Sequence, residues 1–253
     1  MTGRASSLGR RARAARALAA ALVAVAAVRA SAAELTITWD KDLAFEWDRA
    51  NYERTLRELV ARSDAAVAAW LGFARTGPVA LHVLSRGRYE QTFGSGMAWN
   101  TGAFYRDGIV HVNGGARLDG RFAGVLAHEL THAYLDDLGT GHHLPRWLNE
   151  GLAERVGFRV RGEEGLTTGQ VQELKIALQD RRLVPLSAAT GRFLYLQGYA
   201  AVLFLEKKLG KDALLAVVRR TMRQGTFEQA LDAELRWTPK DVDAGFATWV
   251  DTL

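Results

Sequence analysis

Apolar and polar positions along the chain show two different periodicities. Short segments with a period of two and many β-branched residues predict strands at 35–39, 79–84, 103–105 and 109–112. Apolar residues three and four positions apart predict amphipathic helices. These helices are expected at 46–72, from about 120 to 135, and at 146–155, 169–181, 194–209, 211–224, 226–235 and 241–253.

The order of these elements predicts an α+β fold. The four strands lie in the first half of the chain together with helices, whereas the second half contains helices only. We therefore expect an N-terminal lobe with a small mixed sheet over about 34–138 and an all-α C-terminal lobe over about 139–253. The segment 85–100 is polar and rich in glycine, and no element is predicted there.

Residues 1–33 have the composition of a secretory signal peptide. Arginines crowd residues 4–16, a 12-residue apolar stretch follows, and small residues end the segment. This stretch is too short for a membrane span, which needs about 20 residues. We expect cleavage after Ala32 or Ala33, a secreted or periplasmic mature domain over 34–253, and no stable membrane span after cleavage. An uncleaved N-terminal anchor is the alternative.

The formal net charge of +5 belongs to this leader. Its six arginines are balanced by no acid, and the rest of the chain has 27 basic and 28 acidic residues. A basic excess confined to a leader gives no reason to expect a nucleic-acid partner. The chain has no cysteine, which excludes disulfides and a thiol nucleophile.

Two histidines with a glutamate between them mark the helix predicted to begin near Asp119 or Gly120. His128 and His132 are four residues apart, so both rings lie on one face of the helix and can bind one metal ion. Glu129 lies about 100° further round the helix, where it can reach a water molecule at the metal without being a ligand. This is the pattern of zinc hydrolases, in which the glutamate is the general base.

A third ligand is required, because catalytic zinc takes three protein ligands and leaves one position open. Glu150, 18 residues after His132 and on the next predicted helix, is the expected third ligand. Glu154 is one helical turn further and is expected to accept a hydrogen bond from a ligating histidine. Three other histidines have no ligand spacing and are expected to be packed or solvated: His82, His142 and His143.

These motifs resemble the gluzincin metallopeptidases, the clan of thermolysin and aminopeptidase N. The resemblance lies in His128-Glu-Leu-Thr-His132 and in Trp147-Leu-Asn-Glu-Gly-Leu-Ala153, and it assigns Zn²⁺ to the two histidines and Glu150. The other main zincin branch requires a glycine and a third histidine where this chain has leucines. The resemblance covers about residues 95–210 and implies a zincin-like two-lobe domain with the zinc in the cleft between the lobes.

A second stretch, Tyr195-Leu-Gln-Gly198, resembles the helix after the zinc site in aminopeptidase-like members. This resemblance implies that Tyr195 hydrogen-bonds the oxyanion of the tetrahedral intermediate, and Tyr199 is the other candidate. Aminopeptidases also use a strand glutamate to bind the free amine of the substrate. The comparable residues 96–100, Gly-Met-Ala-Trp-Asn, have no carboxylate, which favours an endopeptidase.

We therefore expect an exported zinc-dependent metallopeptidase that acts on a peptide or protein substrate. A strand near 109–112 or 98–103 would present its backbone to the extended substrate. The alternative, from a different functional class, is a zinc-holding binding or scaffold domain with little or no turnover.

Overall fold

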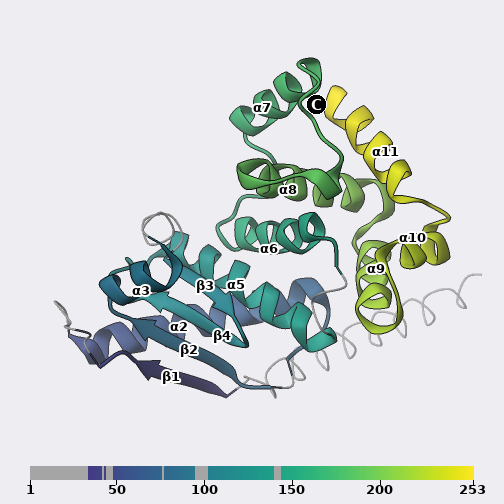
Figure 1. Cartoon of the computed structure of the whole chain (residues 1–253). Coiled ribbons are helices and arrows are strands. Elements are labelled where there is room, and N and C mark those ends of the chain that lie inside the picture. The colour runs from purple at the N-terminus through teal and green to yellow at the C-terminus, as the bar shows by residue number, and fades with distance from the viewer. Residues whose placement is uncertain (1–33, 42, 44–47, 76, 95–101, 140–143) are drawn as a thin grey trace, which may run out of the picture.

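The computed structural model describes residues 34–41, 43, 48–75, 77–94, 102–139 and 144–253. Over these residues the chain has a small four-stranded sheet followed by a helical second half (Figure 1). The predicted mixture of α and β elements is therefore confirmed. In chain order the elements are β1 (Leu35–Trp39), α2 (Arg49–Leu71), β2 (Val79–Leu84), α3 (Arg86–Phe93), β3 (Ala103–Arg106), β4 (Ile109–Asn113), α5 (Gly120–Leu138), α6 (Arg146–Val160), α7 (Thr168–Gln179), the 3₁₀ turn η2 (Leu186–Ala188), α8 (Gly191–Leu209), α9 (Lys211–Gln224), α10 (Phe227–Leu235) and α11 (Pro239–Asp251).

The sheet has the strand order β1-β2-β4-β3, with β3 antiparallel to β4 and the other pairs parallel. β3 and β4 form a hairpin whose turn residues, Asp107 and Gly108, have φ angles of 52° and 80°. Positive φ at both positions gives the tight turn whose twist matches two antiparallel strands. Because β4 is paired on both sides, it cannot present its backbone to a substrate, and that expectation for 109–112 is wrong. β3 is the strand at this edge of the described sheet.

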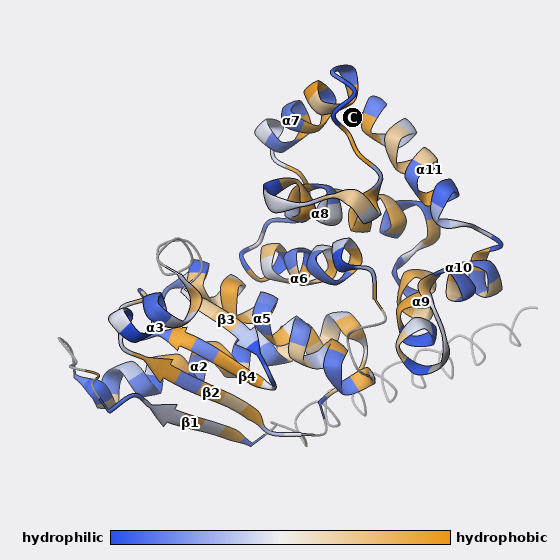
Figure 2. Ribbon diagram, in the orientation of Figure 1, coloured by the Kyte–Doolittle hydropathy of each residue, from blue (hydrophilic) through white to orange (hydrophobic). Residues whose placement is uncertain are grey.

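Helices α2 and α5 cover one face of the sheet. They pack on each other, and the buried Ser63 hydroxyl of α2 donates a hydrogen bond to the Ala123 carbonyl oxygen of α5 over 2.9 Å. The opposite face carries α3, whose Phe93 ring contacts the rings of Phe104 and His111. Figure 2 shows the two central strands as largely hydrophobic. Their residues buried on the α2 and α5 side alternate along the sequence: Val79, Leu81, Val83, Val110 and Val112.

Helix α6 lies between α5 and α8 (Figure 1), and glycines make both crossings close. At the crossing with α5, a Cβ atom on Gly157 would lie 2.8 Å from the Gly124 carbonyl oxygen. At the crossing with α8, a Cβ atom on Gly198 would lie 2.5 Å from the Trp147 carbonyl oxygen. A Cβ atom on Gly151 would in turn collide with the Gly198 carbonyl group. The absence of side chains on these glycines thus sets the separations of α6 from its two neighbours, α5 and α8.

An ion pair adds a second link between α6 and α8. The Arg155 side chain on α6 is only 8% exposed, and its Nε donates to Oε2 of Glu206 on α8 over 2.6 Å. A second guanidinium nitrogen donates to Glu164 over 3.2 Å. Sliding α6 along α8 would break this pair and leave a buried charge without its partner, which is costly. The pair therefore opposes a change in the register of the two helices.

One helix was missed, and several helix bounds differ from the prediction. Helix α3 was not predicted, because its sequence, Arg-Gly-Arg-Tyr-Glu-Gln-Thr-Phe, buries only Tyr89 and so has no apolar stripe. Helix α6 continues to Val160 rather than ending at 155, and α8 begins at Gly191 rather than at 194.

Several sequence-based expectations fall on residues that the structure does not describe: the leader 1–33, the segment 98–101, and His142 and His143. Within the described ranges, no helix combines the length and the apolar character that crossing a membrane would require.

Candidate metal centre

Helix α5 brings the two predicted histidines together. It begins where the sequence predicts, because the Asp119 side chain caps it by accepting hydrogen bonds from the backbone N–H groups of Arg121 and Phe122. The helix buries its apolar residues against the sheet and α2. His128 and His132 project toward α6, and their Nε2 atoms lie 3.2 Å apart.

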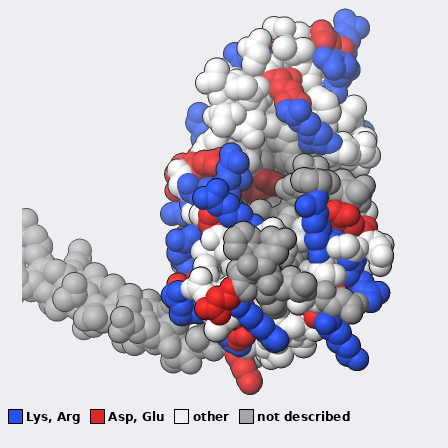
Figure 3. Space-filling model, turned by 90° about the vertical axis from the view of Figure 1, so that its left-hand side faces the viewer, with Lys and Arg blue, Asp and Glu red and all other residues white. Residues whose placement is uncertain are grey.

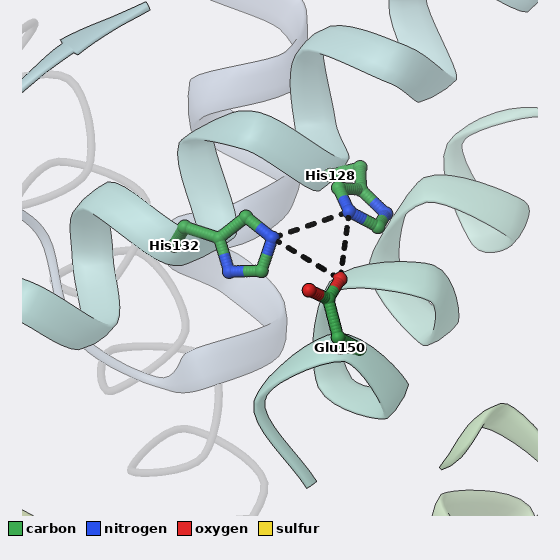
Figure 4. A group of neighbouring side chains, drawn as sticks. All are labelled: His128, His132 and Glu150. Atoms are coloured by element: carbon green, nitrogen blue, oxygen red, sulfur yellow. Dashed lines mark hydrogen bonds and ion pairs between the residues drawn. The ribbon is translucent and has the colours of Figure 1, made fainter. Parts of the chain in front are cut away.

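Helix α6 supplies the third predicted ligand. Oε2 of Glu150 lies 3.5 Å from Nε2 of His128 and 3.6 Å from Nε2 of His132 (Figure 4). In the described part of the chain, these three residues are the one group of histidine and acidic side chains that could hold a metal ion. The structure therefore brings the three predicted ligands to a single point.

The outer nitrogen of each imidazole has an acceptor beside it. Nδ1 of His132 lies 2.7 Å from Oδ1 of Asn149, and Nδ1 of His128 lies 3.5 Å from Oε1 of Glu154. An amide oxygen and a carboxylate only accept hydrogen bonds, so both contacts favour a proton on Nδ1 of each ring. When a ring carries its proton only on Nδ1, its Nε2 presents a lone pair to the centre of the site, which is the tautomer that binds metal. Glu154 thus lies where the sequence places it.

Two lone pairs and a carboxylate oxygen repel one another unless a cation or a proton lies between them. A tetrahedral zinc ion with bonds of about 2.0–2.1 Å holds its ligand atoms about 3.3–3.4 Å apart. The three separations in this site, 3.2, 3.5 and 3.6 Å, are close to that value. Both the spacing and the donor set of two imidazoles and one carboxylate fit Zn²⁺.

Negative charge dominates the surroundings of this site. Burial opposes protonation of His128, but its hydrogen bond with Glu150 and the charges of Glu129 and Glu154 outweigh burial and raise the pKa of His128 to about 9. Burial would also raise the pKa of Glu150, but hydrogen bonds and charge from both histidines hold it well below its usual range. The site therefore attracts positive charge at neutral pH, either a proton or a metal ion.

Glu129 lies beside the histidines but outside the group of ligand atoms. It is only 6% exposed, and its Oε2 accepts a hydrogen bond from the backbone N–H of Tyr105 on β3 over 2.7 Å. Burial raises the pKa of Glu129, whereas the charges of His128 and His132 and this hydrogen bond act in the opposite direction. A buried carboxylate with a raised pKa next to a metal site is suited to accept a proton.

Helix α8 presents Tyr195 to the same region. Its side chain is 39% exposed, and burial together with the charge of Glu150 raises the pKa of its hydroxyl, which stays protonated at neutral pH. Tyr199 is 1% exposed and stacks on Phe158 with 4.5 Å between ring centroids. The Tyr199 hydroxyl is buried without a hydrogen-bond partner among the described residues. Of the two candidates, only Tyr195 is accessible to a substrate.

Two partners of the site are missing from the sequence-based expectations. Asn149 directly precedes Glu150 in the sequence, and this position could have revealed its role. Successive helix residues diverge by only about 100°, so the side chain before a ligand can reach another atom of the same site, here Nδ1 of His132. The other partner, the backbone N–H of Tyr105, leaves no trace in a sequence because every residue except proline has one.

His82 lies away from the metal ligands, as predicted for a packed residue. It faces His111 in register across β2 and β4, with 5.8 Å between the ring centroids. Within the described residues, neither ring belongs to a group that could hold a metal ion.

The space-filling view shows a recess across one face of the molecule (Figure 3). Atoms of Asp or Glu are visible inside the recess, whereas Lys and Arg lie around it.

Comparisons with protein-family models, with curated proteins and with solved structures gave no match. A function for this protein must therefore be inferred from the chemistry of the site.

Proposed function

We propose that the protein is a zinc-dependent peptidase of the gluzincin type. The observation that carries this proposal is the convergence of His128, His132 and Glu150 at 3.2–3.6 Å, with Glu129 next in sequence to the first ligand. A site that only held zinc for stability would use four protein ligands and would have no need of the adjacent carboxylate.

The two imidazoles and the Glu150 carboxylate would hold the ion, and Asn149 and Glu154 would fix the orientation of the rings. Zinc held there would act as a Lewis acid that polarises the scissile carbonyl group and makes water a better nucleophile at neutral pH. Three protein ligands leave one coordination position open for this purpose.

Glu129 would accept the proton of the attacking water and pass it to the leaving amine. One oxygen of its carboxylate is held by the Tyr105 N–H, which leaves the other oxygen for the water. Tyr195 would donate a hydrogen bond to the developing oxyanion, because its hydroxyl is protonated and partly exposed.

The substrate would be a peptide or protein segment in an extended conformation. β3 lies at the edge of the described sheet and contacts α5, so a substrate strand that hydrogen-bonds its outward carbonyl groups would pass the metal ligands, while the Tyr105 N–H stays on Glu129. In this arrangement residues 34–138 and 139–253 form the two lobes of a zincin-like domain, with the zinc in the cleft between them. The absence of an amine-binding glutamate at 96–100 favours endopeptidase activity.

The leader sequence supports export, so the enzyme would act in a secreted or periplasmic location. The near balance of charge in the rest of the chain gives no support for a nucleic-acid partner.

The direct test combines metal analysis with a turnover assay. Elemental analysis of the purified chain should find one zinc per chain, and casein or a fluorogenic peptide library should be cleaved only without chelator. The Glu129→Gln variant should keep the zinc and the fold but lose cleavage. Undiminished cleavage by this variant would refute the mechanism, and bound zinc without any cleavage by the wild type would favour the scaffold alternative.

A further inference from the structure

One residue of the edge strand contacts α5 at two separate points. The backbone N–H of Tyr105 donates to Oε2 of Glu129 over 2.7 Å, and its phenolic hydroxyl donates to Oδ2 of Asp136 over 2.8 Å. Both acceptors belong to α5, on either side of His132 in the sequence. Tyr105 therefore fixes β3 against the helix that carries the histidines.

The hairpin register explains why this N–H is free to reach Glu129. The Asn113 N–H donates to the Gly102 carbonyl oxygen over 2.8 Å, and antiparallel pairs alternate between bonded and non-bonded positions. Counting along the ladder, Tyr105 opposite Val110 is a non-bonded pair. Its N–H consequently points away from β4, toward the helix.

The position of β3 affects Glu129 directly. Among the described residues, the Tyr105 N–H is the only hydrogen-bond donor to the Glu129 carboxylate. β3 is hydrogen-bonded to β4 on one side only, so contacts with α5 determine how its outward N–H lies against the helix. The bond from the Tyr105 hydroxyl to Asp136 is such a contact.

We propose that Tyr105 is a positioning residue for Glu129. Its phenol, anchored on Asp136, holds β3 in place, and its backbone N–H then orients the carboxylate so that the second oxygen faces the reacting water. This inference rests on the proposed function, in which Glu129 is the general base.

The chain offers a matched control for a purely structural role. Tyr134, also on α5, donates its hydroxyl to Oδ1 of Asp64 on α2 over 2.8 Å. Tyr134→Phe removes the same kind of bond at the same length from the same helix, but this bond does not involve the edge strand. Because Tyr134 is buried, with 1% of its surface exposed, Tyr134→Phe should cost at least as much stability as Tyr105→Phe. A loss of kcat caused by reduced stability alone should therefore appear in both variants.

The experiment compares Tyr105→Phe, Asp136→Ala, Asp136→Asn and Tyr134→Phe. Each variant is assayed for bound zinc, kcat, KM and the hydrogen-exchange rate of the residue 105 amide in labelled protein. We expect Tyr105→Phe and Asp136→Ala to keep zinc and KM but to lose about 10- to 100-fold in kcat. Amide exchange at residue 105 should accelerate by about tenfold. Asp136→Asn, which retains an acceptor oxygen, should restore most of the rate, and Tyr134→Phe should change neither kcat nor this amide.

The double variant Tyr105→Phe with Asp136→Ala should be no slower than either single variant, because the two changes break one bond. Full kcat in Tyr105→Phe, or an equal loss in Tyr134→Phe, would overturn the proposal. If the wild type cleaves no peptide, the proposed function fails, whereas the exchange rates still show whether the bond between Tyr105 and Asp136 holds β3 in place. Unaltered amide exchange at residue 105 in Tyr105→Phe would refute this role of the Tyr105 hydroxyl independently of activity.

Discussion

Gly151 of α6 and Gly198 of α8 face each other across a helix crossing that has no room for a side chain on either residue. Each glycine belongs to one of the two motifs that suggested the function, next to Glu150 in the first and three residues after Tyr195 in the second. The close crossing therefore sets the position of Tyr195, the proposed oxyanion donor, relative to Glu150, the proposed third ligand. The glycines have a steric role that explains their place in both motifs.

Replacing Gly198 by alanine should separate the two helices. The new Cβ atom would meet the Trp147 carbonyl oxygen, and overpacking of this kind costs about 1–3 kcal/mol of unfolding free energy. Because α6 carries Glu150, zinc affinity should fall as well. Chemical denaturation and zinc titration of Gly198→Ala measure both effects.

Gly169→Ala is the matched control, because a Cβ atom there has nothing within 4 Å and the residue lies in the first turn of α7. It should raise the stability slightly, by about 0.5–1 kcal/mol, since alanine favours helix. Equal stability and zinc affinity in Gly198→Ala and the wild type would contradict the steric role.

Removing the amide of Asn149 should weaken zinc binding more than removing the carboxylate of Glu154. The contact from His132 to Asn149 is 2.7 Å, whereas that from His128 to Glu154 is 3.5 Å, which is at the limit for a hydrogen bond. Such outer partners typically contribute about 10- to 100-fold in metal affinity. Competition with a chromophoric chelator should therefore rank the zinc affinities as wild type, Glu154→Ala and Asn149→Ala, in decreasing order.

Glu173→Ala, which breaks an ion pair with Arg192 outside the site, should bind zinc like the wild type. An Asn149→Ala protein with unchanged affinity would show that the His132 ring is oriented by other contacts.

The two tyrosines of α8 should respond oppositely to loss of the hydroxyl group. Tyr195→Phe removes the proposed oxyanion donor and should reduce kcat by about 100- to 1000-fold with zinc content unchanged. Tyr199→Phe removes a buried hydroxyl that has no partner among the described residues, so the variant should remain active and be as stable as the wild type or about 1 kcal/mol more stable. Steady-state kinetics and thermal unfolding of both variants test this contrast, and comparable activity of the two would contradict the assignment.

Zinc affinity should rise with pH up to about 9. In the metal-free protein burial disfavours the charged His128, yet Glu150 and the neighbouring carboxylates raise its pKa to about 9, so zinc must displace a proton below that pH. One displaced proton corresponds to about a tenfold gain in affinity for each pH unit, with a plateau above about 9. Chelator competition between pH 7 and pH 10 measures this slope.

The same proton stabilises the metal-free fold. Because the pKa of His128 is raised above its unfolded value, this contribution is fully present below about pH 6.5 and is lost as the pH rises through about 9. A zinc affinity independent of pH between 7 and 9 would mean that His128 is already neutral in the metal-free protein.

The cluster of His128, His132 and Glu150 could be predicted because helix geometry fixes most of it locally. Residues at i and i+4 share a face, so His128 and His132 required no knowledge of the fold, and Glu150 followed from the need for a third ligand on the next helix. The contact between Tyr105 and Glu129 could not be predicted, since it joins a backbone group to a side chain across 24 positions. It depends on the hairpin register, which tertiary packing decides.

Two predictions failed for related reasons: helix α3 was not predicted, and β4 was expected to pair with the substrate. Helix α3 lies on the sheet through few apolar side chains, so its sequence has no stripe to reveal it. The residues of β4 indicate a strand but not its neighbours, and pairing on both sides appears only when β2 and β3 are in place. Periodicity predicts which residues form an element, whereas the neighbours of that element are a property of the assembled fold.

Two of the three proposed ligands come from α5, which packs on the sheet, and one comes from α6, the first helix of the part that has no strands. A bound ion would therefore link α5, which packs on the sheet, to α6 and the helices that follow it. In a protein without a single cysteine, a chelator would remove this link as a reducing agent removes a disulfide from other proteins.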